Sequence, residues 1–169
     1  MLNLLLLAST VAHATEVGTL KKLGIGANIG YPVSVTGKYF VAEKWAVSAY
    51  VGTSWGVYWD IRAQAERDLV TFHEWDFGTL GMYACAGLQL DIYPPSVTYG
   101  PTLNAAPGFY GGAAVTLRFS DSPAEVFAGA DLGIGIGTWD FLYVKNDPRY
   151  GTLGPYGIGH ANLGGRWFF

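Results

Sequence analysis

The sequence predicts an all-β protein, an eight-stranded antiparallel up-and-down transmembrane β-barrel. Apolar and polar residues alternate with a period of two along most of the chain, which is typical of strands with one apolar face. The 169 residues include 24 glycines, about twice the average usage, and 15% aromatic but only 14% charged residues. Glycine interrupts nearly every window in which a helical periodicity could begin, so no helix is expected.

Eight stretches of the chain carry this alternation, and most approach the roughly 9–11 residues that a tilted transmembrane strand needs. Within each stretch one set of alternate residues is apolar, whereas the other set mixes glycine, tyrosine, serine and ionisable residues. The expected strands are 23–31, 33–41, 45–55, 59–66, 80–92, 109–119, 125–136 and 160–169.

The connections between the strands predict the orientation of the barrel. With both termini in the periplasm, Glu43-Lys44 and the segment 120–123 become short periplasmic turns, while 93–108 and 138–156 become long outward-facing loops. The segment 68–78 is also expected to be a connecting loop, although it is long for a periplasmic turn. The register of 56–78 stays open, because a slip by one residue would exchange the two faces of the strand.

The composition of the two faces favours a membrane barrel over a soluble sheet. A soluble barrel places large aliphatic side chains inside and charges outside. Here the apolar face is wide and nearly free of charge, and aromatic residues near the strand ends suit the two membrane interfaces. These aromatic residues are Tyr31, Tyr39, Trp45, Trp55, Trp59, Tyr93, Phe109, Phe119 and Trp167. A secreted soluble ligand-binding barrel, with the two faces exchanged, remains the alternative.

The ionisable residues of the other face are expected to form a polar network inside the barrel. Buried charges persist when they are paired, because desolvating a lone one costs on the order of several kcal/mol. The expected network comprises Lys38, Asp60, Arg62, Glu66, Asp91, Arg118, Glu125, Asp131 and Arg166. Since eight strands enclose a space just wide enough for side chains, we expect a filled interior. A narrow channel for small solutes is the alternative.

The first 14 residues are typical of a cleaved signal peptide. The apolar run Leu2–Val11 is too short to cross a bilayer as a helix, and Ala12-His13-Ala14 fits the small-x-small cleavage pattern. No Lys or Arg precedes the run, which departs from the usual pattern. Cleavage after Ala14 would leave residues 15–169 as an exported barrel domain.

The end of the chain resembles the recognition motif of bacterial outer-membrane barrels. The motif has a polar residue, a glycine two positions later, and aromatic residues at the third-last and last positions. Asn162, Gly164, Trp167 and Phe169 match it. In that family the barrel-assembly machinery pairs with the edge of the final strand. The resemblance therefore implies this machinery and the outer-membrane lipid as partners.

Most of the mature chain also resembles a group of small barrels in the outer-membrane β-barrel superfamily, with OmpA/OmpX-like architecture. The resemblance rests on the opening strand Leu23–Gly26, the turn Gly30–Pro32, the following Gly37–Tyr39 and the segment Ala124–Gly129. It implies the fold and a place in the bacterial outer membrane. It implies no established biochemical role.

The residues do not suggest an enzyme. Lipid A deacylase barrels resemble serine hydrolases with a His two positions before the nucleophile, but His160 is followed by Ala161 and Asn162. One His and two carboxylates at 73–76 have weak spacing for a metal, and the single Cys85 excludes a cysteine cluster. We therefore expect no catalytic residue, metal or cofactor. A lipid A-modifying enzyme is the least favoured alternative.

The net charge of −3 argues against nucleic acid as a partner, because a basic patch is needed to neutralise phosphates. The leading hypothesis is an integral outer-membrane protein with a structural role, or with a binding role carried by its outward loops.

Overall fold

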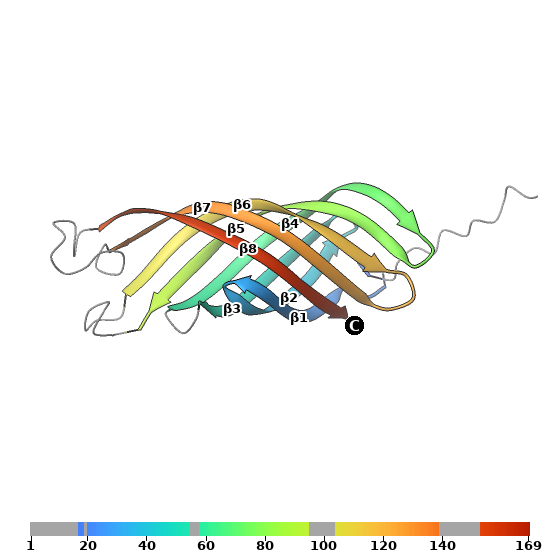
Figure 1. The fold of residues 1–169 in the computed structure, drawn as a ribbon, viewed down its shortest axis with the longest axis horizontal. Coiled ribbons are helices and arrows are strands. Elements are labelled where there is room, and N and C mark those ends of the chain that lie inside the picture. The colour runs from blue at the N-terminus through green and yellow to red at the C-terminus, as the bar shows by residue number, and fades with distance from the viewer. Residues whose placement is uncertain (1–16, 19, 55–57, 95–103, 139–152) are drawn as a thin grey trace, which may run out of the picture.

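Eight antiparallel strands form one closed barrel in the computed structural model (Figure 1). Each strand pairs with its neighbours in sequence, and the last strand pairs with the first. The structure describes residues 17–18, 20–54, 58–94, 104–138 and 153–169; the expected signal peptide, 1–14, and its cleavage site lie outside these residues. This architecture confirms the predicted eight-stranded up-and-down barrel.

The strands are β1 (Leu23–Tyr31), β2 (Val33–Ala42), β3 (Trp45–Ser54), β4 (Tyr58–Trp75), β5 (Gly78–Tyr93), β6 (Asn104–Phe119), β7 (Ala124–Thr138) and β8 (Leu153–Phe168). Closure between β1 and β8 extends over the register from Gly24↔Phe168 to Tyr31↔Ala161, so the barrel satisfies its backbone hydrogen bonds internally. Within the described residues, no helix is long and apolar enough to cross a membrane.

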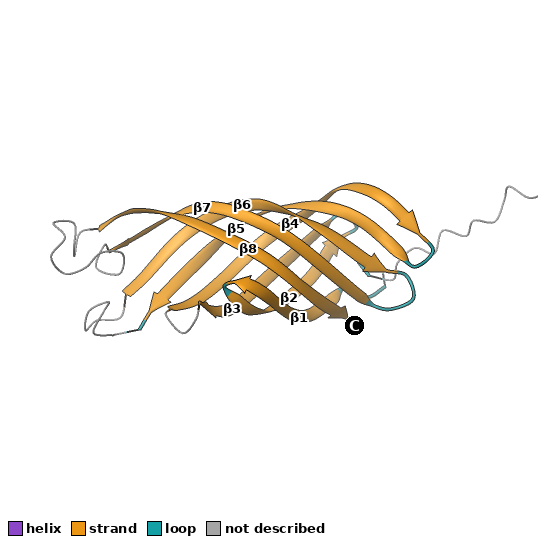
Figure 2. Cartoon of the chain, in the orientation of Figure 1, coloured by secondary structure: helices purple, strands orange, loops and turns teal. Residues whose placement is uncertain are grey.

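The two ends of the barrel differ in how they connect the strands (Figure 2). At the turn end, the short connections 43–44, 76–77 and 120–123 lie together with the C-terminus. At the distal end, Pro32 links β1 to β2 through a cis peptide bond. The other three distal connections run through 55–57, 95–103 and 139–152, which lie outside the described residues. The structure thus places the predicted short turns at the same end as the C-terminus.

Alternation along each strand separates an apolar outer surface from a polar interior. The outer surface carries exposed large side chains such as Ile25, Val35, Val47, Leu88 and Leu132. The alternate positions point inward, where most of the buried residues are polar or charged. Because side chains of a strand point to opposite faces in turn, the period-two pattern directly produces this division.

The segment 68–78 is not the connecting loop that the sequence predicts. Strand β4 continues to Trp75, and the turn to β5 consists of Asp76 and Phe77. The register shifts twice in this part of β4, between Asp68 and Val70 and between Thr71 and His73. Such bulges insert an extra residue and interrupt the period-two pattern, which is why the alternation did not reveal the strand.

The long distal connections are also shorter than expected. Residues 104–108 belong to β6 and residues 153–156 to β8, although the sequence predicts loops there. Pro107 of β6 pairs with β5, but the pairing of β6 with β7 begins only at Gly108. Pro155 of β8 pairs with β7, but the pairing of β8 with β1 extends only as far as Ala161. Each proline therefore lies where its strand has one neighbour, a position that tolerates a missing N–H.

The packing of β8 leads to a first prediction. A Cβ atom added at Gly164 would lie 2.5 Å from Cζ of Phe127, whereas nothing lies within 4 Å of a Cβ at Gly157. We expect Gly164→Ala to lower the free energy of unfolding by about 1–3 kcal/mol through overpacking, and Gly157→Ala to change it little. Urea titration of the purified protein in detergent, followed by the gel shift between folded and boiled protein, measures both. Equal effects of the two changes would contradict the close contact at Gly164.

Candidate functional site

Six ionisable side chains form an ion-paired cluster inside the turn end of the barrel. This turn-end cluster consists of Lys38 on β2, Glu66 and Asp68 on β4, Arg118 on β6, Glu125 on β7 and Arg166 on β8. Three cations thus face three carboxylates. Alternation brings each of these side chains inward, and the register of the barrel brings them together.

Glu125 is the centre of the turn-end cluster. Its side chain is fully buried and accepts hydrogen bonds from all three cations. Lys38 Nζ lies 3.1 Å and Arg118 Nε 3.0 Å from Oε2, and Arg166 Nη1 lies 2.9 Å from Oε1. A buried carboxylate is tolerated in such surroundings because paired charges and hydrogen bonds replace its hydration.

The other two carboxylates complete the balance of charge. Lys38 Nζ lies 2.8 Å from Oε2 of Glu66. Arg118 donates from Nη1 and Nη2 to the two carboxylate oxygens of Asp68, at 2.7 and 2.9 Å. The bidentate geometry fixes the guanidinium plane as well as its position.

Aromatic rings surround the cations of the turn-end cluster. The guanidinium of Arg166 lies 4.2 Å from the centre of the Phe127 ring, and Lys38 Nζ lies 4.9 Å from the centre of the Tyr83 ring. Nearer the turn end, Phe40 and Phe168 pack together with Val17 in a small apolar cluster. The ring contacts add cation–π attraction to the turn-end cluster. The small apolar cluster lies between these charges and the turn end of the barrel.

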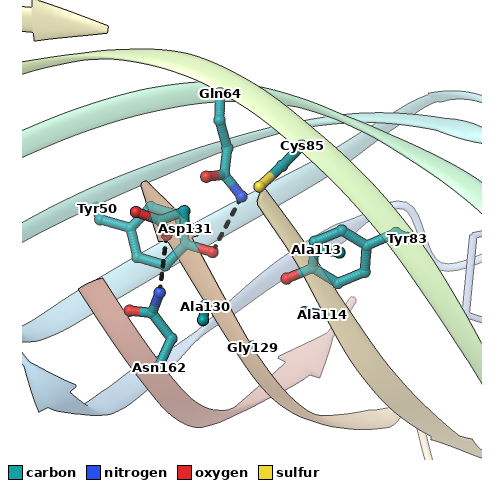
Figure 3. A pocket seen from close by; sticks show the side chains of 10 residues that line it. All are labelled: Tyr50, Gln64, Tyr83, Cys85, Ala113, Ala114, Gly129, Ala130, Asp131 and Asn162. Carbon is teal, nitrogen blue, oxygen red and sulfur yellow. Dashed lines mark hydrogen bonds between the residues drawn. The ribbon is translucent and has the colours of Figure 1, made fainter. Parts of the chain in front are cut away.

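In the middle of the barrel, polar side chains that include Tyr50, Gln64 and Asn162 line a small cavity together with Asp131 (Figure 3). Gln64 donates to the hydroxyl of Tyr50 over 3.3 Å and accepts from the hydroxyl of Tyr110 over 2.9 Å. The cavity beside them, which Cys85 also lines, measures about 10 Å³. A space of this size holds about one water molecule. Side chains therefore occupy the barrel between its two ends at this level.

A second ionisable cluster lies toward the distal end. This distal cluster consists of Asp60, Arg62, Asp91, Asp131 and His160. Nε of Arg62 donates to Asp60 over 2.7 Å, and Nδ1 of His160 forms a short hydrogen bond with Oδ1 of Asp131. Asn162 donates to the other oxygen of Asp131 over 3.1 Å. Three carboxylates here face one guanidinium and one imidazole.

The nine residues expected to form one network lie in two clusters. Lys38, Glu66, Arg118, Glu125 and Arg166 belong to the turn-end cluster, and Asp60, Arg62, Asp91 and Asp131 to the distal cluster. Eight of the nine are buried, and the Arg118 side chain is 15% exposed. Tyr50 connects the clusters, since Arg166 donates to its hydroxyl over 2.5 Å and the guanidinium of Arg62 lies 4.7 Å from the centre of its ring.

Sequence reasoning missed two members of these clusters and misplaced one aromatic residue. Asp68 lay in the expected loop, yet it continues the inward series of Asp60 to Glu66, which could have identified it. His160 is expected from the sequence to be an interior polar residue near a rim, and it is buried, but the expected network did not include it. Tyr93 was expected at the outer surface, but it is 7% exposed and its ring centre lies 5.0 Å from that of Tyr58. It follows Gln89 and Asp91 on the inward face of β5.

The four residues of the C-terminal motif do not gather into one site. Trp167 and Phe169 point outward and are exposed, whereas Asn162 and Gly164 lie on the inward face of β8. Gly164 leaves room for the ring of Phe127. The motif thus combines two outward aromatic residues with two inward positions that the interior packing uses.

Within the described residues, no group of three or more His, Cys, Asp or Glu side chains could hold a metal ion. In the segment 73–76, the His73 ring packs against Trp75 with 4.5 Å between ring centres.

Comparison with known proteins identifies the fold. No protein-family model and no curated protein sequence matches the chain. Among solved structures, the N-terminal β-barrel domain of Pseudomonas aeruginosa OprF is similar, with a TM-score of 0.60 and 14% sequence identity. The match covers 88% of this chain and 96% of that domain. The chain therefore has the fold of the small OmpA-like outer-membrane barrels.

The position of Glu125 leads to a second prediction. Glu125→Gln keeps the shape of the side chain but leaves three cations facing two carboxylates. We expect it to lower the free energy of unfolding by roughly 3–5 kcal/mol, because it leaves a buried charge uncompensated. Urea titration of the purified protein measures this change. Glu43→Gln in the exposed turn is the matched control, with an expected change below about 0.5 kcal/mol. A similarly small effect at Glu125 would show that the cluster contributes little to stability.

Proposed function

We propose that this chain is an integral protein of the bacterial outer membrane, with a structural role or a binding role carried by its outward segments, and with a filled interior. The observation that supports the proposal is the reversed polarity of the barrel. Large aliphatic side chains cover its outside, and eight charged side chains of the expected network are buried within it. A soluble barrel has the opposite arrangement.

Lipid accounts for the outer surface better than water does. Ile29, Leu88 and Leu132 are each about 70% exposed or more, and they belong to an apolar surface that surrounds the barrel. Soluble monomers rarely expose contiguous apolar patches larger than a few hundred Å². A bilayer would cover this surface, and the closed ladder leaves few backbone groups for lipid to face.

Exposed aromatic residues near both ends support the same placement. Trp45 and Trp167 lie outward near the turn end, while Tyr31 and Trp59 lie outward near the distal end. Rings with a polar edge favour the two interfaces of a bilayer. Together with the short turns, this arrangement supports a periplasmic turn end and an outward distal end.

The packed interior supports a non-conducting role. The turn-end cluster spans the barrel from β2 through β4, β6 and β7 to β8, and the described cavity in the middle measures about 10 Å³. Eight-stranded barrels are commonly filled in this way. We therefore propose a filled, non-enzymatic barrel.

Export and assembly complete the proposal. The signal peptide would be cleaved after Ala14, and the barrel-assembly machinery would read Asn162, Gly164, Trp167 and Phe169. The aromatic residues Trp167 and Phe169 support this role, because they point outward and are exposed. The loops expected to bind partners lie largely within 95–103 and 139–152, outside the described residues.

A matched pair of arginine substitutions tests the membrane placement. Ala130 lies outward near the middle of β7, and Ala42 lies outward at the end of β2 beside a turn. In a bilayer, Ala130→Arg should cost about 2–4 kcal/mol and Ala42→Arg about 0–1 kcal/mol.

Cell-envelope fractionation and the heat-dependent gel shift provide the measurement. We expect the unmodified protein in the outer-membrane fraction, migrating faster before boiling, and a smaller folded fraction for Ala130→Arg than for Ala42→Arg. Recovery of the unmodified protein in the soluble fraction without a gel shift would refute the proposal.

Conductance tests the filled interior. The purified protein, refolded into a planar bilayer, should show no discrete conductance steps, because the turn-end cluster and the central side chains occupy the lumen. Refolding buffer with detergent alone is the control. Regular single-channel steps would establish the narrow-channel alternative instead.

A further inference from the structure

Two carboxyl groups face each other inside the distal end of the barrel. Asp60 of β4 lies directly opposite Asp91 of β5 in the strand register, and both side chains point inward. Asp60 is 0% and Asp91 is 3% exposed. The two carboxyl groups are hydrogen-bonded to each other. We refer to Asp60 and Asp91 together as the carboxyl pair.

Each member of the carboxyl pair uses one oxygen for other partners and the second oxygen for this contact. Oδ1 of Asp60 accepts from Nε of Arg62 over 2.7 Å. Oδ2 of Asp91 accepts from Nε2 of Gln89 over 2.7 Å and from the hydroxyl of Tyr156 over 3.1 Å. The remaining oxygens, Oδ2 of Asp60 and Oδ1 of Asp91, are buried and accept from no other donor among the described residues. These two oxygens are therefore the ones that meet.

A hydrogen bond between two carboxyl groups requires a proton on one of them. An ionised carboxylate has acceptors only, whereas a protonated carboxyl group has an O–H donor. Two ionised carboxylates at opposed and buried positions also repel each other, which is why closely paired aspartates share a single proton. The contact between Asp60 and Asp91 thus indicates that one of the two is protonated.

The neighbouring side chains favour the proton on Asp91. Arg62 supplies a positive charge to Asp60, whereas the donors to Asp91 are the neutral groups of Gln89 and Tyr156. An opposite charge favours the ionised form of a carboxyl group. Oδ1–H of Asp91 then donates to Oδ2 of Asp60, and the single negative charge of the pair lies beside Arg62.

Further titratable groups and a cavity lie next to the carboxyl pair. Nε2 of His160 lies 3.9 Å from Oδ2 of Asp60. Asp91 lines a cavity of about 160 Å³ at the distal end. Water can enter a space of this size with polar walls, so a proton released from the pair has a route to the solution. The titratable and charged groups around the pair are Tyr58 and Arg62 on β4, Tyr110 on β6, Asp131 on β7, and Tyr156 and His160 on β8.

We propose that Asp60 and Asp91 share one proton at neutral pH and form a pH-sensitive link between β4 and β5 at the distal end of the barrel. The link is a hydrogen bond between side chains, in addition to the backbone ladder. Raising the pH removes the proton, leaves two opposed carboxylates and weakens this end of the barrel. The link is formed by the barrel interior, so the inference does not depend on where the barrel resides.

Carbon NMR of the aspartate carboxyl groups tests the shared proton. The full-length protein is labelled with ¹³C at these groups, refolded in a maltoside detergent and titrated from about pH 5 to about pH 9. Each carboxyl resonance is assigned through its bonds to its own backbone, so no variant is needed. We expect the resonances of Asp60 and Asp91 to move together as the pair releases one proton. Asp121, in the exposed connection at the turn end, provides the reference for a hydrated carboxylate.

The pH dependence of stability tests the link itself. The folded protein holds a proton that an unfolded aspartate releases at about pH 4, so stability must fall as the pH rises above this value. Between about pH 6 and about pH 8, the equilibrium constant for unfolding should rise roughly tenfold more for the unmodified protein than for Asp91→Asn. The amide of this variant donates to Asp60 and has no proton to lose. Urea titration at each pH, read by the heat-dependent gel shift, measures the difference. The matched control Asp121→Asn should keep the pH dependence of the unmodified protein.

Two results would each overturn the proposal. The NMR titration could show Asp60 and Asp91 both ionised at neutral pH, with the shift of a hydrated carboxylate. Folded Asp91→Asn could keep the full pH dependence of stability, which would assign that dependence to another group such as His160. If Asp91→Asn gives no gel shift and so has not folded, the NMR titration of the unmodified protein decides the question.

Discussion

The closed hydrogen-bond ladder is the constraint on which the rest of the structure depends. Pairing of β1 with β8 removes the free edges of the sheet over the closed part of the barrel. A sheet closed in this way has one face outside and the other enclosed, so each strand must divide its side chains between two different environments. In this chain the enclosed face receives the polar residues. The interior must then satisfy its own charges and hydrogen bonds.

The two ends of the interior meet this demand differently. At the turn end, Glu125 receives three cations, and two further carboxylates balance them. This arrangement joins five strands by contacts that do not depend on the backbone ladder. At the distal end, Arg62 pairs with Asp60 and His160 with Asp131, and Asp91 lies directly opposite Asp60 on the neighbouring strand. A single lumen thus combines a self-contained charged cluster at the turn end with a larger cavity at the distal end.

Local pattern accounts for the success and the failure of the strand predictions. Where alternation is regular, as in β1 to β3, the expected and observed strands agree within a few residues. The prediction failed in β4, where two register shifts interrupt the pattern after Asp68. It also failed at Pro107 and Pro155, because proline and glycine are typical of loops and the sequence does not show that a strand has only one neighbour there.

The sequence by itself determined the all-β class, the number of strands and the division of each strand into an apolar and a polar face. These properties depend on residues close together in the chain. The tertiary structure decided how the polar residues combine. Lys38 and Glu125, for example, are 87 positions apart and meet only because the register of the closed barrel brings β2 and β7 to the same level. The placement of Asp91 beside Tyr156, 65 positions away, likewise depends on that register. Pairing across a barrel is a property of the register of its strands, and bulges that change the register leave little trace in composition or periodicity.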